Sequence, residues 1–314
     1  MEIILGLDQL KRPLRNPVVT LGNFDGVHLG HQRILSKVRK EASKIEGEAV
    51  VITFEPHPLK VLAPDRCPPL LTSFRKKMML LEQSGIQTVL CIQFSPPFSE
   101  ISPLDFVKRI LIERIGARKV IVGYDYHFGK GQEGDVSLLK RICEPLHVEV
   151  EVVAPLTVGD TTVSSSKIRE LIKTGKVEEA SKLLGKDYPI LGRVVEGARR
   201  GRILGFPTAN VEASDELYPL EGIYAVEVFW HEQRYNGVAD IGYNPTFTPR
   251  VGGQERTPLL EVHILDFNRN IYGDEIQISF KKRIRGEIRF DSPSELVTQI
   301  QKDIEWAKEN VFNT

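Results

Sequence analysis

A chain of 314 residues is long enough to form two ordinary domains, each with its own hydrophobic core. It carries 42 basic and 42 acidic residues, and the resulting net charge of zero argues against a globally basic nucleic-acid-binding protein. Cys67, Cys91 and Cys143 lack metal-binding spacing, so we expect a reducing compartment. The amino-terminal residues 1–15 hold only a short apolar stretch, which predicts neither a signal peptide nor a membrane span and favours a cytoplasmic location.

The first half of the chain alternates strand-like and helix-like segments. β-branched runs of strand length occupy five segments, residues 17–21, 49–54, 88–94, 119–122 and 148–153. Helical patterns separate or follow them, around residues 34–42 and 78–81, from Ser102-Pro103 to just before Gly116, and at 166–174 and 177–184. This alternation predicts an α/β domain, with a parallel sheet that is covered by helices on both faces.

The pattern changes from Pro189 onward. Strand-like runs follow one another, separated by glycine-rich turns, until a capping box at residues 292–295 leads into a helix at 296–310. This arrangement predicts an antiparallel β-barrel with a terminal helix. We therefore expect the domain boundary near residues 184–188, which gives domains of residues 1–185 and 186–314.

The segment GNFDGVHLGH, residues 22–31, joins the first of these strands to the first helix. Ligands of parallel sheets bind beyond the carboxyl ends of the strands, and Gly22, Gly26 and Gly30 allow backbone to approach a phosphate at the helix start. His28 and His31 lie three residues apart, on one helix face, where both can donate hydrogen bonds to a triphosphate. The alternative is that one histidine caps the helix and the other packs on the sheet.

A second anion-binding element is predicted in SSSKIRE, residues 164–170. Ser165 and Ser166 stand at the start of a later helix, where hydroxyls and backbone amides are available, and Arg169 follows one turn on. The alternative is an ordinary serine cap followed by a solvated arginine.

Gly129, Gly131 and Gly134 match GxGxxG, with Glu149 and Glu151 downstream, as in a dinucleotide-binding turn. Five residues separate the end of the preceding strand, at Gly123, from the first of these glycines. Because a dinucleotide-binding turn connects strand and helix tightly, we favour a different role for this loop.

The second half contains a basic, glycine-rich loop, residues 197–210. Its backbone amides, together with nearby arginines, can cradle phosphates at three glycines, Gly197, Gly201 and Gly205. Thr208 and Asn210 alternate onto one side of an extended segment and offer the hard oxygen ligands that Mg²⁺ prefers. A surface loop with an asparagine turn is the alternative.

Glu261 stands at the start of the strand-like segment EVHILDF, residues 261–267. If Val262, Ile264 and Phe267 share one face, Glu261 points the other way and can deprotonate an alcohol at the mouth of a barrel. A solvated strand glutamate is the alternative.

Four motifs of the first half resemble, in order and spacing, the adenylyltransferase module of the bacterial bifunctional riboflavin kinase/FMN adenylyltransferase (FAD synthetase) family. They are GNFDGVHLGHQ, TFEPHP, VGYDYHFGKGQEGD and VSSSKIRE, and the similarity covers residues 15–185. The resemblance implies a Rossmann-like HxGH nucleotidyltransferase sheet in which His28, His31 and Arg169 are catalytic. It also implies that ATP phosphates contact Ser165, Ser166 and the turn that holds Gly22, Phe24 and Gly30. Asp125 and Phe128 would face the flavin and adenine. The resemblance supports a role at the site less strongly for His57 and Arg66.

Residues 184–307 resemble the riboflavin kinase module of the same family. The motifs are GRILGFPTAN, GIYAV, GVADIGYNPTF, LEVHILDF and RGEIRFDS, in family order. The resemblance implies that Thr208 and Asn210 share Mg²⁺ with ATP, that Glu261 activates the ribityl 5′-hydroxyl of riboflavin, and that Arg285 borders the flavin. The loop at residues 247–257 departs from the family pattern.

The resemblance therefore implies an enzyme that phosphorylates riboflavin to FMN with ATP, and then adenylylates FMN to FAD plus pyrophosphate. Two alternatives are an adenylyltransferase for another phosphate acceptor and a non-catalytic protein that senses flavin or RNA. The expected partners are small molecules (riboflavin, FMN and ATP), with no nucleic acid and no membrane, and a weak homo-oligomer is compatible with the sequence.

Overall fold

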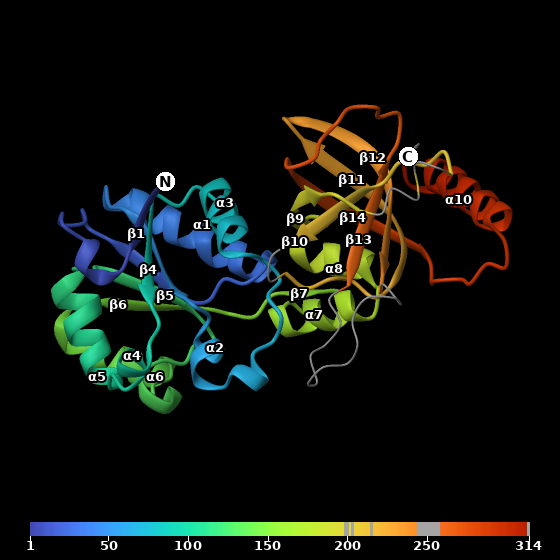
Figure 1. Ribbon diagram of the computed structural model, residues 1–314. Coiled ribbons are helices and arrows are strands. Elements are labelled where there is room, and N and C mark those ends of the chain that lie inside the picture. The colour runs from blue at the N-terminus through green and yellow to red at the C-terminus, as the bar shows by residue number, and fades with distance from the viewer. Residues whose placement is uncertain (198–200, 202–203, 214–215, 244–257, 313–314) are drawn as a thin grey trace. The chain divides into compact units, whose positions relative to one another are not determined.

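The computed structural model describes residues 1–197, 201, 204–213, 216–243 and 258–312, which form two compact units (Figure 1). Unit 1 comprises residues 1–69 and 74–164, and unit 2 comprises residues 70–73 and 165–314. The division therefore falls earlier in the chain than the boundary expected at residue 185, which stays a prediction. Along the described chain, no helix is both long and apolar enough to cross a membrane.

Unit 1 is built on a parallel sheet of six strands in the order β1-β4-β3-β2-β5-β6. The five strands from β2 to β6 lie where the β-branched runs predict them, and β6 forms one edge of the sheet. The strands are β1 (Glu2–Leu5), β2 (Val18–Leu21), β3 (Ala49–Glu55), β4 (Thr88–Gln93), β5 (Lys119–Gly123) and β6 (Glu149–Val153). The central strands are buried on both faces, as a parallel sheet between two helical layers requires.

Helices cover the two faces of this sheet separately. Leu35 and Val38 of α1 (Leu29–Lys44) and Leu81 of α3 (Phe74–Gln83) pack with one set of strand residues. On the other face, the π-helix η3 (Phe106–Arg114), which continues α5 (Pro103–Asp105), packs with α6 (Val136–Cys143). The predicted α/β architecture is thus confirmed.

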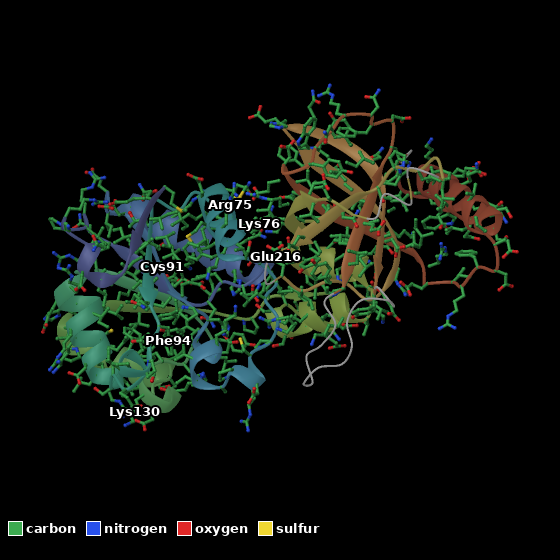
Figure 2. The ribbon with its side chains drawn as sticks, viewed as in Figure 1. Arg75, Lys76, Cys91, Phe94, Lys130 and Glu216 are labelled. Atoms are coloured by element: carbon green, nitrogen blue, oxygen red, sulfur yellow. The ribbon has the colours of Figure 1, made fainter. Side chains whose placement is uncertain are left out.

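Short elements complete unit 1. They are α2 (Pro58–Leu62), α4 (Pro96–Ser99), a hairpin of β7 (Thr157–Val158) and β8 (Thr161–Thr162), and the 3₁₀ turns η1 (Leu7–Gln9), η2 (Pro64–Arg66), η4 (Lys130–Gln132) and η5 (Glu144–Leu146). Cys91 lies within β4, and Phe94 directly follows the end of this strand (Figure 2). Burial raises the pKa of the Cys91 thiol to about 11, so it is an unreactive core residue.

Unit 2 contains a closed barrel in the order β10-β13-β12-β11-β14-β9, in which neighbouring described strands pair antiparallel. The strands are β9 (Tyr188–Val195), β10 (Ala209–Ala213), β11 (Gly222–Trp230), β12 (Gln233–Gly242), β13 (Leu259–Ile264) and β14 (Glu275–Arg285). Tyr188, Tyr224 and Phe280 are the largest fully buried side chains of the described residues, with the Tyr224 and Phe280 rings at 90° and 5.4 Å apart. This confirms the predicted barrel.

In the described part of unit 2, helices α7, α8 and α10 and one short segment accompany the barrel. The terminal helix α10 (Pro293–Ala307), which η6 (Lys308–Phe312) extends, begins at the predicted cap, where Glu295 N donates to Ser292 Oγ at 3.3 Å. α7 (Ser165–Lys173) and α8 (Val177–Leu184) pack on each other, and α8 contacts β9 and β14. Residues 70–73 join the barrel through buried Glu216, which accepts hydrogen bonds from Ser73 N at 2.8 Å and Leu191 N at 2.9 Å.

Candidate active sites

The turn between β2 and α1 has an unusual backbone. Phe24 and Val27 adopt positive φ angles of 50° and 42°, which are uncommon for residues other than glycine. Their side chains are 2 % and 1 % exposed and belong to the core beneath α1, so apolar burial offsets the backbone cost. The packing of these two side chains therefore supports the unusual backbone of the turn.

His28 and His31 lie together at the start of α1. His28 is the N-cap residue, and its Nδ1 accepts a hydrogen bond from His31 N at 3.3 Å. The two rings stack with centroids 3.6 Å apart, and the Phe24 ring meets His31 edge-on at 5.1 Å. The alternative of a capping histidine thus describes the geometry of His28, but it does not exclude a ligand. With Nδ1 as the acceptor, neutral His28 carries its proton on Nε2, which is a donor.

Two glycines of this turn have little space for a side chain. A Cβ atom on Gly30 would lie 3.2 Å from the His28 ring, and one on Gly22 would lie 3.3 Å from the Phe24 ring. Larger residues at either position would displace the aromatic side chains that shape the turn.

The TFEPHP segment lies beside the same turn. His57 caps α2 by accepting a hydrogen bond from Leu59 N at 3.2 Å, and its Nε2 lies 3.2 Å from the side-chain amide nitrogen of Asn23. Asn23 follows β2 directly, so two motifs from neighbouring strands meet at the carboxyl edge of the sheet. Arg66 lies in η2 and is exposed.

The two residues expected at the flavin have different surroundings. Asp125 is exposed just beyond β5, and its carboxylate lies close to Gly123. Phe128 is 6 % exposed and packs in the core against Tyr126 and Phe106. Gly134 pairs with Phe128 through two backbone hydrogen bonds of 2.9 Å, so the GxGxxG match forms a closed loop and not a strand–helix turn.

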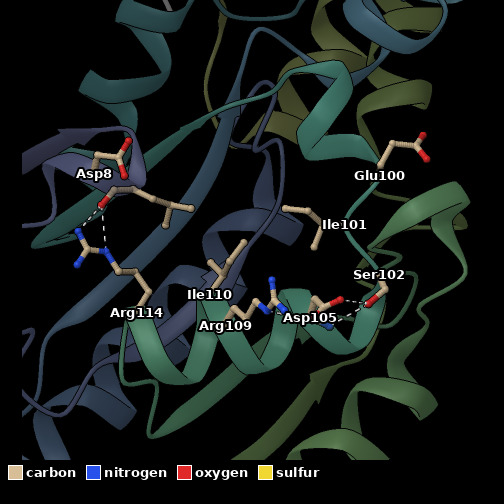
Figure 3. Close-up of a pocket in the computed structure, with 9 residues that line it drawn as sticks. Asp8, Glu100, Ile101, Ser102, Asp105, Arg109, Ile110 and Arg114 are labelled. Atoms are coloured by element: carbon tan, nitrogen blue, oxygen red, sulfur yellow. Dashed lines mark hydrogen bonds and ion pairs between the residues drawn. The ribbon is translucent and has the colours of Figure 1, made fainter.

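A hollow of about 460 Å³ elsewhere in unit 1 contains none of the predicted site residues. It is lined by residues of η1, the segment 100–102, α5 and η3, including Asp8, Asp105 and Arg109 (Figure 3). Arg109 forms an ion pair with Asp105 at 3.1 Å, and Arg114 donates to the Leu7 carbonyl, so these arginines already have protein partners.

Ser165, Ser166 and Arg169 of SSSKIRE belong to unit 2, whereas Ser164 is the last residue of unit 1. α7 begins at Ser165, as the sequence predicts, with Ser166 exposed and Arg169 9 % exposed. The start of the helix therefore offers hydroxyls and backbone amides in unit 2.

The structure brings Thr208, Asn210 and Glu261 together on the barrel. Thr208 Oγ1 donates to Glu261 Oε2 at 3.0 Å, and Asn210 on β10 is the direct partner of Glu261 on β13. The burial alternation of β13 agrees with an outward-facing Glu261 up to Ile264, where the strand ends. A strict alternation would place Leu265 on the same side as Glu261. Leu265 is instead buried, because β13 ends at Ile264 and the alternation does not extend beyond it.

The glycine-rich loop approaches these side chains closely. A Cβ atom on Gly197 would lie 2.1 Å from the Asn210 amide, and one on Gly201 would lie 3.2 Å from Thr208 Oγ1. Gly205 has a φ of 89°, a conformation that favours glycine. His263 Nδ1 lies 2.9 Å from the Pro207 carbonyl, which fixes the chain just before Thr208. The loop at residues 247–257, whose sequence departs from the family pattern, lies outside the described residues.

Sequence reasoning did not single out Asp240, the β12 partner of Glu261. Asp240 retains solvent exposure, yet partial desolvation of its carboxylate and the neighbouring Glu287 and Glu261 raise the pKa of Asp240 to about 6. An acidic residue within the alternating segment GVADIG was the available signal. Arg285 donates to Asp303 of α10 at 2.7 and 3.0 Å, so it ties the terminal helix to β14.

A glycine-flanked histidine pair at a parallel-sheet turn and a carboxylate beside hard oxygen donors on a barrel define a two-part nucleotide-dependent transferase. The FAD synthetase family matches residues 10–167, and the riboflavin kinase family matches residues 184–311.

Curated relatives match nearly the whole chain. The bifunctional riboflavin kinase/FMN adenylyltransferase of Escherichia coli K12 is 37% identical, with 98% of this chain and 97% of the relative covered. The protein of that name from Bacillus subtilis is 37% identical over 94% and 92% of the two chains. A crystal structure described as a macrolide-efflux protein from Streptococcus pneumoniae shares the fold, with a TM-score of 0.87, 32% identity and coverage of 98% and 99%. The chain belongs to the bifunctional riboflavin kinase/FMN adenylyltransferase family.

Proposed function

We propose that the two reactions of this family are divided between the two sites described above. The chain phosphorylates riboflavin to FMN with ATP and adenylylates FMN to FAD. We assign riboflavin phosphorylation to the barrel site around Glu261, and adenylyl transfer to the β2–α1 turn with His28 and His31. The boundary at residue 185 is proposed as the limit between the two family modules, which match on either side of it.

The contact between Thr208 and Glu261 carries the assignment of the kinase site. The attacking group of riboflavin is an alcohol, which needs a base to accept its proton, and Glu261 is the proposed base. The hydrogen bond from Thr208 fixes the orientation of the Glu261 carboxylate. Because the hydroxyl hydrogen points to Glu261, the lone pairs of Thr208 Oγ1 remain for a cation.

The donor set suits Mg²⁺. Thr208 and Asn210 supply two neutral oxygen ligands beside a loop whose glycines admit phosphate, and Mg²⁺ in phosphoryl-transfer sites takes few protein ligands and several from phosphate or water. Bound there, Mg²⁺ would neutralise charge on the phosphates of ATP. Among the described residues, no cluster of three or more His, Cys, Asp or Glu side chains is arranged to hold a metal, which suits a cation held largely by the nucleotide.

Adenylyl transfer needs no general base, because the attacking phosphate of FMN is already anionic. Catalysis then requires that two phosphates be aligned and that charge on the α-phosphate and pyrophosphate be neutralised. His28 and His31 are proposed to donate to these phosphates at the start of α1. Ser165, Ser166 and Arg169 are proposed to contribute further phosphate contacts from α7, and Asp125 and Phe128 to face flavin and adenine. Arg285 is proposed to border the flavin of the kinase site.

The proposed partners are the small molecules riboflavin, FMN and ATP, and the proposed location is the cytoplasm. The test is to incubate the purified chain with riboflavin, ATP and Mg²⁺ and to separate the flavins by chromatography. Sequential appearance of FMN and FAD is expected, and a single variant at either site should block only one step. Equal loss of both steps in both variants would reject the two-site assignment.

A further inference from the structure

Lys77 of α3 is a buried cation that the two reactions leave unexplained. Its side chain is 7 % exposed, and burial lowers its pKa, whereas the carboxylates of Glu55 and Asp25 act in the opposite direction. A buried ammonium costs several kcal/mol unless nearby groups compensate it. A methionine would fill the same volume without that cost, so the position of the charge calls for a functional reason.

The ammonium is connected to the β2–α1 turn. Lys77 Nζ donates to Thr53 Oγ1 at 3.3 Å, and Thr53 Oγ1 donates in turn to the Asn23 carbonyl at 3.4 Å. Both bonds are long, so each is weak, but together they lead from α3 through β3 to the first turn of the site. The Asn23 side chain then faces His57, which extends the connection to the TFEPHP segment.

The same ammonium lies among the acidic groups of these two motifs. Asp25 is 5 % exposed within the turn, and Glu55 ends β3 at the start of TFEPHP. Both carboxylates oppose the approach of ATP and FMN phosphates, since like charges in a partly buried site repel strongly. A fixed positive charge behind the turn offsets them without occupying the space of the substrates.

We propose that Lys77 is a positioning residue of the adenylyltransferase site, whose buried ammonium steadies the Asn23 turn through Thr53 and offsets Glu55 and Asp25. The inference rests on the assignment of adenylyl transfer to this turn. It does not make Lys77 a catalytic residue, because Lys77 acts through the turn and its acids. Its side chain also lies over the Phe74 ring, with Nζ 5.8 Å from the ring centre, which helps to fix its place.

The test compares Lys77→Met with Lys40→Met in the full chain. Lys40 is an exposed residue of α1, so Lys40→Met removes one positive charge from the same unit without touching the turn. For Lys77→Met we expect FAD formation from FMN to fall about tenfold in kcat/KM, with KM for ATP raised, since one unit charge near phosphates is worth about that factor. Riboflavin phosphorylation should stay within twofold for both variants. Unchanged FAD formation in Lys77→Met would overturn the proposal.

A double variant separates charge from packing. Lys77→Met with Glu55→Gln removes the cation together with its strongest acidic neighbour, so FAD formation should recover to within about threefold of wild type. No recovery, or a loss that simply follows a lowered melting temperature of unit 1, would mean that Lys77 only supports the fold. If His28→Ala fails to reduce FAD formation selectively, the site assignment itself is wrong. If His28→Ala behaves as proposed and Lys77→Met is silent, only the inference about Lys77 fails.

Discussion

Replacing Glu216 by alanine removes the acceptor that attaches residues 70–73 to the barrel. The carboxylate is 4 % exposed and accepts hydrogen bonds from Ser73 N at 2.8 Å and Leu191 N at 2.9 Å. Hydrogen bonds to a charged group contribute about 1.5–3 kcal/mol each, so the loss of both predicts about 3–6 kcal/mol less stability. For a unit of this size, such a change lowers the melting temperature by about 10 °C.

Tryptophan fluorescence during urea unfolding measures this effect in unit 2 alone. The chain has two tryptophans, Trp230 and Trp306, and both belong to unit 2. Glu212→Ala is the matched control, because Glu212 is an exposed glutamate on β10, and it should change stability by about 0.5 kcal/mol or less. If Glu216→Ala unfolds at the same urea concentration as Glu212→Ala, the carboxylate does not hold the segment and the reasoning is wrong.

His28→Ala should lower FAD formation from FMN about 100-fold, as loss of a preorganised donor does, and leave riboflavin phosphorylation within twofold; equal losses in both assays would refute the division of sites. Glu261→Gln should lower riboflavin phosphorylation about 100-fold or more and spare FAD formation from added FMN, whereas retained kinase turnover would remove Glu261 as the base. Asp240→Asn should stabilise unit 2 by about 1 kcal/mol at pH 8, a value discounted for solvent exposure. The pKa of Asp240 in the folded chain lies above its ordinary value of 3.8. The stability that the protonated Asp240 carboxyl contributes to unit 2 is therefore intact below pH 4 and is lost as pH rises through about 6. The stabilisation of unit 2 by Asp240→Asn should therefore disappear near pH 4 in urea titrations. A stabilisation that does not change with pH would contradict this explanation. A fragment of residues 165–314 should unfold at higher urea concentration than one of residues 186–314, since α8 packs on β9 and β14; equal midpoints would show that these helices add nothing.

Much of the fold followed from local pattern. Val19, Val51 and Ile121 lie in β-branched runs, and fully buried runs of this kind between amphipathic helices predict a parallel sheet. The first strand, β1, was missed because Glu2–Leu5 is short and partly exposed, and its pairing with β4 is far along the chain. Helix α6 was also missed, although Asp135 caps it through Leu138 N at 2.7 Å.

The candidate sites were predictable in composition but not in detail. The spacing of His28 and His31 placed both on one helix face, yet their stacking depends on the positive φ angles of Phe24 and Val27, which no local rule assigns to such residues. Likewise, Thr208 and Glu261 are 53 positions apart, so their hydrogen bond depends on barrel register. Lys77 belongs to none of the recognised sequence motifs, and only its burial in the structure marks it as a candidate site residue.

The attachment of residues 70–73 to Glu216 also bears on the order in which the chain acquires its structure during synthesis. Ser73 leaves the ribosome 143 residues before Glu216. At about 5–20 residues per second, this interval lasts about 7–30 s. During that time the sheet of unit 1 can assemble from residues 1–69 and 74–164 while the segment between them has no barrel to join. The segment therefore emerges as a loop between the two parts of unit 1, and it can join the second unit only after Glu216 has been synthesised.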